Sequence, residues 1–124
     1  MIINTGNDVV SVKNMEESIL SYDWYLPWLF RPSEQAYCAQ YANRYQQYAG
    51  IYSVKGAVMQ ALEIDWHSSV KWTEIEVTHT SAGEPEVLLH DGVKKFATAL
   101  QVKTIHVSLS QTEQYAASVV TLER

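Results

Sequence analysis

The sequence predicts an α+β fold in which a long helix packs against an antiparallel sheet. Strand-like and helix-like segments are mixed along the chain, without the regular strand–helix alternation of a parallel α/β protein. Between residues 34 and 63, apolar and tyrosine side chains recur every three or four positions, which is typical of a helix. Residues 104–122 alternate apolar and polar side chains, as strands with one buried face do. At 124 residues, the length favours a single domain over residues 1–124.

The first thirty residues are expected to form a strand and a short helix. Residues 1–12 are rich in isoleucine and valine, and Gly6 lets this strand bend or approach a neighbour closely. A helix is predicted over residues 14–20, with Asn14 as its N-cap. The aromatic stretch that follows, residues 21–30, is broken by a proline.

One long helix is predicted from Ser33, its expected N-cap, to about Glu63, and Gly50 is a candidate bend. Four apolar residues at helical spacing should face the core: Ile51, Val54, Val58 and Leu62. Lys55 and Gly56 fall on other faces of this helix. Five tyrosines form a second stripe: Tyr37, Tyr41, Tyr45, Tyr48 and Tyr52. So many tyrosines on one small domain favour an oligomer interface over the core.

The second half is predicted to contain four strands and one helix. In order, the segments are a strand over residues 70–78, a turn over 81–85, a strand over 86–90, a helix over 91–100 with Asp91 as N-cap, and two strands over 104–110 and 115–122. The last two strands are joined by a short polar connection, which predicts an antiparallel pair.

Composition excludes several classes of protein. The chain is 47% hydrophobic, which argues against disorder, and its net charge of −5 argues against nucleic-acid binding. It contains one cysteine, Cys38, so an internal disulfide and a cysteine-based zinc site are excluded, and Cys38 is expected to be a buried small residue. No apolar run approaches the roughly 18 residues of a membrane span. We therefore expect a soluble, cytoplasmic protein that binds neither nucleic acid nor a membrane.

The order of these segments resembles the holo-acyl-carrier-protein synthase family, the small trimeric phosphopantetheinyl transferases. Gly6 and Asp8 match a Gly-x-Asp motif after the first strand. Further similar stretches follow in the family's order: residues 30–38, ending in Tyr-Cys, residues 52–57, which contain a Val-Lys pair, residues 81–85 and residues 106–116. The resemblance spans nearly the whole chain.

The resemblance implies an activity and a set of site residues. Family members transfer the phosphopantetheine arm of coenzyme A to a serine of an acyl carrier protein, in fatty-acid or polyketide assembly, at sites between the protomers of a trimer. By resemblance Asp8 is a ligand of Mg²⁺, and Lys55 is both the catalytic lysine and a contact of the coenzyme A phosphates. Ser108 and Ser110 are candidate coenzyme contacts, although they also suit an ordinary alternating strand.

Several positions depart from the family pattern. The second metal-ligating residue of the family, a glutamate, is Gly56 here, and the family's histidine is Gln111. Glu63 lies seven residues beyond Gly56, about 10 Å along a helix, and does not replace that ligand. Carrier proteins are acidic and are usually met by arginines, whereas residues 23–31 of this acidic chain carry aromatic side chains instead: Trp24, Tyr25 and Trp28.

Three hypotheses follow from these substitutions. The first is a catalytically degenerate family member whose binding of Mg²⁺ and coenzyme A is weakened or lost. It binds a carrier protein, binds coenzyme A without turnover, or pairs with an active homologous subunit. Its expected assembly is a homotrimer, or a mixed trimer if it pairs with that homologue. The second is an active Mg²⁺-dependent transferase that uses Asp8 and Lys55 with unusual partners. The third is a structural protein that uses its aromatic half as a docking face.

Overall fold

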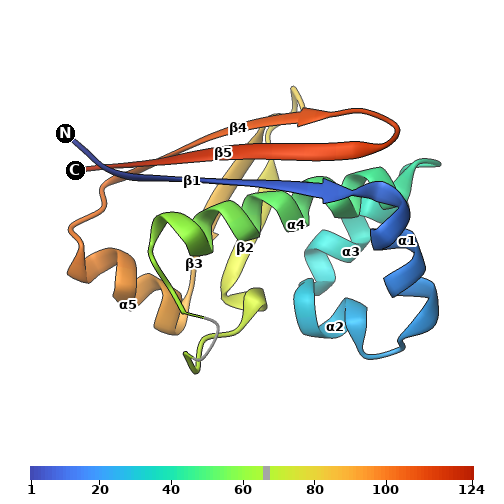
Figure 1. Cartoon of the computed structure of the whole chain (residues 1–124), viewed down its shortest axis with the longest axis horizontal. Coiled ribbons are helices and arrows are strands. Elements are labelled where there is room, and N and C mark those ends of the chain that lie inside the picture. The colour runs from blue at the N-terminus through green and yellow to red at the C-terminus, as the bar shows by residue number, and fades with distance from the viewer. Residues whose placement is uncertain (66–67) are drawn as a thin grey trace.

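A three-stranded antiparallel sheet and one long helix form the centre of the fold, in a computed structural model that describes residues 1–65 and 68–124 (Figure 1). β1 (Ile2–Ser11) and β4 (Thr104–Gln111) both pair with β5 (Tyr115–Glu123), so the sheet order is β1–β5–β4. α4 (Arg44–Ala61) lies along one face of this sheet and contacts all three strands. The predicted α+β class and the packing of a helix on an antiparallel sheet are therefore confirmed.

The strand register decides which side chains face α4. Val120 of β5 pairs with Gly6 of β1 and with Val107 of β4, and Val120 is fully buried. Gly6 lies so close to α4 that a Cβ placed on it would meet the Ala57 carbonyl oxygen and the Ala61 amide nitrogen. The predicted close approach at Gly6 is confirmed, and it lets β1 lie directly against the helix backbone.

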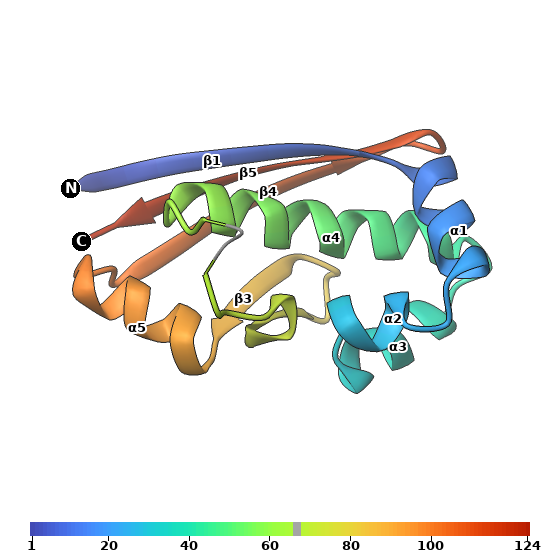
Figure 2. The same ribbon diagram turned by 60° about the horizontal axis from the view of Figure 1, so that its bottom comes forward.

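A second layer covers the other side of α4. It contains the hairpin of β2 (Ile75–His79) and β3 (Pro85–Leu89), and α5 (Asp91–Ala99), which follows β3. Figure 2 shows α4 between the main sheet and this layer. A short 3₁₀ helix, η1 (Trp72–Glu74), leads into β2.

Three short helices gather at one end of the molecule, beside the start of α4. They are α1 (Val12–Ser21), α2 (Tyr25–Leu29) and α3 (Pro32–Ala39). The N-cap of α1 is Ser11, whose hydroxyl accepts a hydrogen bond from the Asn14 amide, so the prediction of Asn14 as N-cap is wrong by three residues.

The single helix predicted from Ser33 to Glu63 is wrong, because the chain forms two helices here. α3 ends at Ala39 and α4 begins at Arg44, while Gly50 lies inside the continuous α4. Both helices bury one face at the same three- and four-residue spacing, so the periodicity does not reveal the turn between them. The N-cap of α3 is Arg31, because Pro32 occupies the first helical position, where its missing N–H costs nothing.

Two boundaries in the second half also differ from the predictions. The strand expected from residue 70 begins at Ile75, because the Glu74 carboxylate accepts the Lys71 amide and closes the 3₁₀ turn of η1 first. The N-cap of α5 is His90 and not Asp91, which is the first helical residue.

Burial in α4 includes the predicted apolar row and extends to other faces of the helix. Ile51, Val54, Val58 and Leu62 are buried, as predicted, and so is Cys38 of α3. Lys55, which was predicted to lie on another face of the helix, is also buried, with 0% exposure. The tyrosine stripe is not one surface either, because it is divided between two helices and Tyr48 belongs to the core. None of the helices in the described part of the chain has the length and hydropathy that crossing a membrane requires.

Candidate functional site

Asp8 lies near the end of β1, on the face of the sheet that packs against α4. It pairs with Ser118 of β5, whose hydroxyl is buried against that of Ser53 in α4. The Oδ1 atom of Asp8 accepts a hydrogen bond from the Val9 amide at 3.0 Å. Burial raises the pKa of the Asp8 carboxyl above its ordinary value, and the Val9 hydrogen bond opposes this rise only in part.

Gly56 of α4 is the direct neighbour of this carboxylate. A Cβ placed on Gly56 would meet Asp8 Oδ2, and the Asp8 Cγ is 3.0 Å from the Cβ position. The Asp8 carboxylate therefore fills the space in which a side chain at position 56 would begin. Because position 56 is a glycine, the Asp8 carboxylate can pack directly against the helix.

A cavity of about 320 Å³ opens beside Asp8. Its walls come from β1, α1, α2, α4 and η1 and include Asn14, Tyr25, Tyr52 and Trp72. The rings of Tyr52 and Trp72 are stacked, with centroids 4.9 Å apart and an angle of 13° between their planes. Burial raises the pKa of the Tyr52 hydroxyl, and the nearby Tyr25 and Asp8 add to the rise. The site is thus one carboxylate in an aromatic-walled cavity.

This cavity does not supply a complete set of protein ligands for a magnesium ion. Mg²⁺ is usually bound by one or two carboxylates together with substrate phosphates and waters. Asp8 is the carboxylate that lines this cavity, and its Oδ2 lies against Gly56. In residues 1–65 and 68–124, no three histidine, cysteine, aspartate or glutamate side chains lie close enough together to hold a metal ion.

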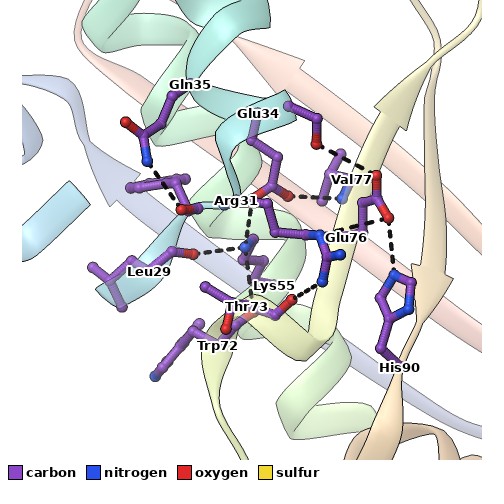
Figure 3. Close-up of polar contacts among 12 residues, drawn as sticks. Leu29, Arg31, Glu34, Gln35, Lys55, Trp72, Thr73, Glu76, Val77 and His90 are labelled. Carbon is purple, nitrogen blue, oxygen red and sulfur yellow. Dashed lines mark hydrogen bonds and ion pairs between the residues drawn. The ribbon is translucent and has the colours of Figure 1, made fainter. Parts of the chain in front are cut away.

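Lys55, the second predicted site residue, is held in the core by three acceptors. Its Nζ donates to the Leu29 carbonyl at 2.6 Å, to Glu34 Oε1 at 2.8 Å and to the Trp72 carbonyl at 3.2 Å (Figure 3). An ammonium group has three N–H donors, so none is left for a phosphate. Burial lowers the pKa of the Lys55 ammonium, and the Glu34 carboxylate opposes that shift.

Glu34 connects this buried ammonium to the rest of the second layer. Its Oε1 also accepts the Arg31 amide at 2.7 Å, and its Oε2 accepts the Val77 amide at 2.8 Å. Arg31 in turn donates from Nη1 to the Thr73 carbonyl and lies 3.7 Å from Glu76 (Figure 3). The pair of Lys55 and Glu34 therefore fixes α3, α4, η1 and β2 relative to one another.

The remaining predicted residues lie on β4, away from Asp8. Ser108 and Ser110 are exposed and alternate with the partly buried Val107 and Leu109, so they lie on the sheet face opposite α4. Gln111, at the end of β4, turns towards α4, where its Nε2 donates to the Gln46 carbonyl at 3.1 Å. Of the four predicted site residues, the structure brings only Asp8 to the cavity.

Sequence reasoning missed the aromatic walls and the partner of Lys55. Tyr25, Tyr52 and Trp72 come from three separate elements, and no local spacing connects them. Glu34 carried one usable signal, since its carboxylate accepts the amide of the residue three positions earlier, as in a helix capping box.

A second cavity of about 460 Å³ lies beyond Trp72, with Trp28 and Met59 among its walls.

Comparisons with known proteins agree with this geometry. The family model of the 4'-phosphopantetheinyl transferase superfamily matches residues 4–120. A holo-[acyl-carrier-protein] synthase from Solibacter usitatus is 34% identical over 124 residues, which cover 99% of each chain.

Solved structures of such synthases share the fold over the whole chain. The synthase from Neisseria meningitidis has a TM-score of 0.87 at 21% identity and covers 100% of both chains. The synthase from Helicobacter pylori, in complex with coenzyme A, has a TM-score of 0.83 at 21% identity and covers 96% of this chain and 99% of its own. Together with the family model and the full-length relative, these matches show that the chain belongs to the holo-[acyl-carrier-protein] synthase family of the 4'-phosphopantetheinyl transferase superfamily.

Proposed function

We propose that this protein is a catalytically degenerate member of its family. It acts with an acyl carrier protein in fatty-acid or polyketide assembly, as a binding or partner subunit, and does not transfer phosphopantetheine efficiently by itself. The proposal concerns the metal and phosphate chemistry of the Asp8 site, because such transfers depend on neutralising charge around phosphorus.

The contact between Asp8 and Gly56 is the observation that carries this proposal. A transferase that positions Mg²⁺ with two carboxylates needs the second one on α4, beside Asp8. Here the helix has no side chain at that position, and Asp8 Oδ2 rests against Gly56. A lone, half-buried carboxylate offers Mg²⁺ one protein ligand, so the remaining ligands would have to be substrate phosphates and waters.

The positions that would handle phosphate give further support. The three N–H donors of Lys55 are occupied by acceptors of its own chain. Gln111 uses its amide to join β4 to α4, and its Nε2 lies where a Cβ on Gly50 would be. Both side chains therefore stabilise the fold, and phosphate binding would require each to give up its present contacts.

The alternative function is an active Mg²⁺-dependent transferase that moves phosphopantetheine from coenzyme A to a carrier-protein serine. Two observations favour it: the chain matches the Solibacter usitatus synthase over 99% of its length, and Asp8 still lines an open cavity. In this case Asp8, water and the substrate phosphates would hold the metal ion between them.

One assay separates the two functions. The protein is incubated with coenzyme A, Mg²⁺ and several apo carrier proteins, and each carrier is weighed by intact mass spectrometry, with an active family member as positive control. We expect no phosphopantetheine increment with this protein. An increment that disappears in Asp8→Ala would establish the active transferase and overturn the degenerate one. Calorimetric titration with coenzyme A then tests whether the coenzyme is bound without turnover, and an absence of binding would favour a purely structural role.

We also propose that the protein assembles as a homotrimer or as a mixed trimer with an active homologous subunit. The sheet face opposite α4 supports this, because it exposes apolar side chains on neighbouring strands: Val9, Tyr115 and Val119 are each at least half exposed. Native mass spectrometry of the protein alone, and after mixing with an active homologue, distinguishes the two assemblies from a monomer.

A further inference from the structure

The Asp8 carboxylate is a half-buried negative charge that no cation of the described chain pairs with. The ion pairs within residues 1–65 and 68–124 involve Glu34, Glu76 and Glu123, and none involves Asp8. Within the described residues, the Asp8 carboxylate accepts a hydrogen bond from the Val9 amide. Removing a carboxylate from water without a partner is costly, so a positive charge that enters the cavity gains more than it would at the open surface.

The cavity walls favour an organic cation over a metal ion. Tyr25, Tyr52 and Trp72 line it together with Asp8, and the Tyr52 and Trp72 rings are stacked on one another. Aromatic faces attract ammonium and guanidinium groups through the ring quadrupole, with tryptophan the strongest partner. A hydrated divalent ion gains little from such walls, because it needs further oxygen ligands that position 56 does not supply.

We propose that the cavity at Asp8 binds the guanidinium group of an arginine side chain presented by a second protein. This inference rests on one part of the proposed function, the absence of a metal-binding carboxylate at position 56. Guanidinium is planar, weakly hydrated and able to donate two hydrogen bonds to one carboxylate while its face stacks on an aromatic ring. Its planar face can stack on one of the aromatic rings that line the cavity, and its N–H groups can donate to the Asp8 carboxylate.

The size of the cavity agrees with a single side chain. Its volume of about 320 Å³ is at the lower end of the roughly 300–1,000 Å³ that is common for ligand pockets. Ser11, Asn14 and Ser18 also line the cavity. Their side-chain oxygens can accept hydrogen bonds from the guanidinium N–H groups that do not donate to Asp8.

The arginine must come from another molecule, because the chain's own three are engaged elsewhere. Arg31 donates to the Thr73 carbonyl, Arg44 lies over the Tyr45 ring, and Arg124 donates to the Leu100 carbonyl. None of these residues lines the cavity. The net charge of −5 further favours a partner with a basic surface segment.

Binding is tested by nuclear magnetic resonance on the full-length ¹⁵N-labelled protein, without Mg²⁺ or coenzyme A. The ligands are arginine blocked at both ends, blocked citrulline as a neutral isostere, blocked lysine, and a five-residue peptide with a central arginine. We expect saturable shifts of the Asp8 and Val9 amides and of the Trp72 indole. Blocked arginine should bind at least about tenfold more tightly than citrulline and more tightly than lysine, and the peptide more tightly still.

Variants locate the binding to this cavity. Asp8→Asn keeps the shape of the side chain and should weaken arginine binding about tenfold or more, because a hydrogen bond between two charged groups is lost. Trp72→Leu should bind arginine more weakly, because it removes one aromatic ring from the cavity wall. Asp23→Asn, at an exposed acid outside the cavity, is the matched control and should behave as the unmodified protein.

Equal affinity for arginine and citrulline, or unchanged binding in Asp8→Asn, would overturn the inference. Tight binding of Mg²⁺ alone, with the same amide shifts, would also overturn it, because the cavity would then be a metal site. Binding of blocked arginine without any gain for the peptide would reject a protein partner. If the protein transfers phosphopantetheine and also binds arginine, the proposed function is wrong and this inference stands. If it neither transfers phosphopantetheine nor binds arginine, this inference is wrong and the proposed function stands.

Discussion

The Lys55 ammonium lies 2.8 Å from the Glu34 carboxylate, and both side chains are completely buried. This contact joins α4 to α3, and the carbonyls of Leu29 and Trp72 complete the surroundings of the ammonium group. A buried ion pair adds little stability compared with apolar side chains of the same size, but breaking it leaves an uncompensated charge.

Lys55→Met should therefore lower the free energy of unfolding by about 3–5 kcal/mol, because Glu34 loses its counter-ion in the core. The double variant Lys55→Met with Glu34→Leu should recover part of this loss, since no charge remains buried. Urea denaturation followed by circular dichroism measures both. A double variant less stable than Lys55→Met alone would show that the hydrogen bonds of Glu34 to the Arg31 and Val77 amides matter more than the charge.

The His79 imidazole should make the stability depend on pH. Its ring stacks on Tyr37 with centroids 3.8 Å apart, and burial lowers the pKa of His79 below its ordinary value of 6.5. The unfolded chain thus takes up a proton at a higher pH than the folded chain. The stability due to the neutral ring is complete above pH 6.5 and falls as the pH drops through 6.5 towards the folded pKa.

The variant His79→Phe isolates this effect, because it keeps a ring against Tyr37 but cannot be protonated. The difference in unfolding free energy between the two proteins should be constant above about pH 7.5 and should shift in favour of His79→Phe at lower pH. Asp8 and Glu76 also have shifted pKa values, but they occur in both proteins and cancel in the difference. A difference that does not change between pH 8 and pH 5 would contradict the prediction.

Restoring a carboxylate at position 56 should increase metal binding. Gly56→Glu places a second carboxylate beside Asp8, whose side chain must rotate away from the helix to admit the new Cβ. We expect a higher Mg²⁺ affinity by calorimetry, and any phosphopantetheine transfer in the mass-spectrometric assay should rise with it. Gly56→Ala is the matched control, because it displaces Asp8 in the same way and adds no ligand. No change in either measurement would mean that the pocket has been lost by more than one substitution.

Gly6→Ala should destabilise the protein through steric overlap. The added Cβ would meet the Ala57 carbonyl oxygen and lie 2.7 Å from the Ala61 amide nitrogen, and helix backbone cannot move aside as a side chain can. The loss should be at least about 1–3 kcal/mol, the usual cost of overpacking. Thr5→Ala, at the neighbouring exposed position, should cost less than about 1 kcal/mol. Equal melting temperatures for the two variants would contradict the close approach of β1 to α4.

The sequence predicted the parts of the fold that depend on local periodicity. The apolar row of α4 and the two closing strands follow from residue spacing, because one face of each is buried and the other is not. The turn between α3 and α4 did not follow, since both helices continue the same spacing across it. Family resemblance, and not periodicity, located Asp8 and the substitution at Gly56.

The burial of Lys55 could not be predicted from its own helix. A lysine beside a buried valine is normally solvated, and its counter-ion, Glu34, is 21 residues away on another helix. The aromatic walls around Asp8 are likewise a product of tertiary packing, because Tyr25, Tyr52 and Trp72 meet only after α2, α4 and η1 have assembled. Such sites require contacts between elements, which spacing along the chain does not record.

The order of the main sheet determines when it can form during translation. β5 leaves the ribosome after every other strand, yet it is the strand with which both β1 and β4 pair. Until residues up to Glu123 have emerged, β1 has no strand partner and its backbone edge stays open to unrelated chains. The sheet therefore cannot form before β5 has emerged, and a chain that stops before Tyr115 cannot assemble it and becomes a substrate for chaperones or proteases.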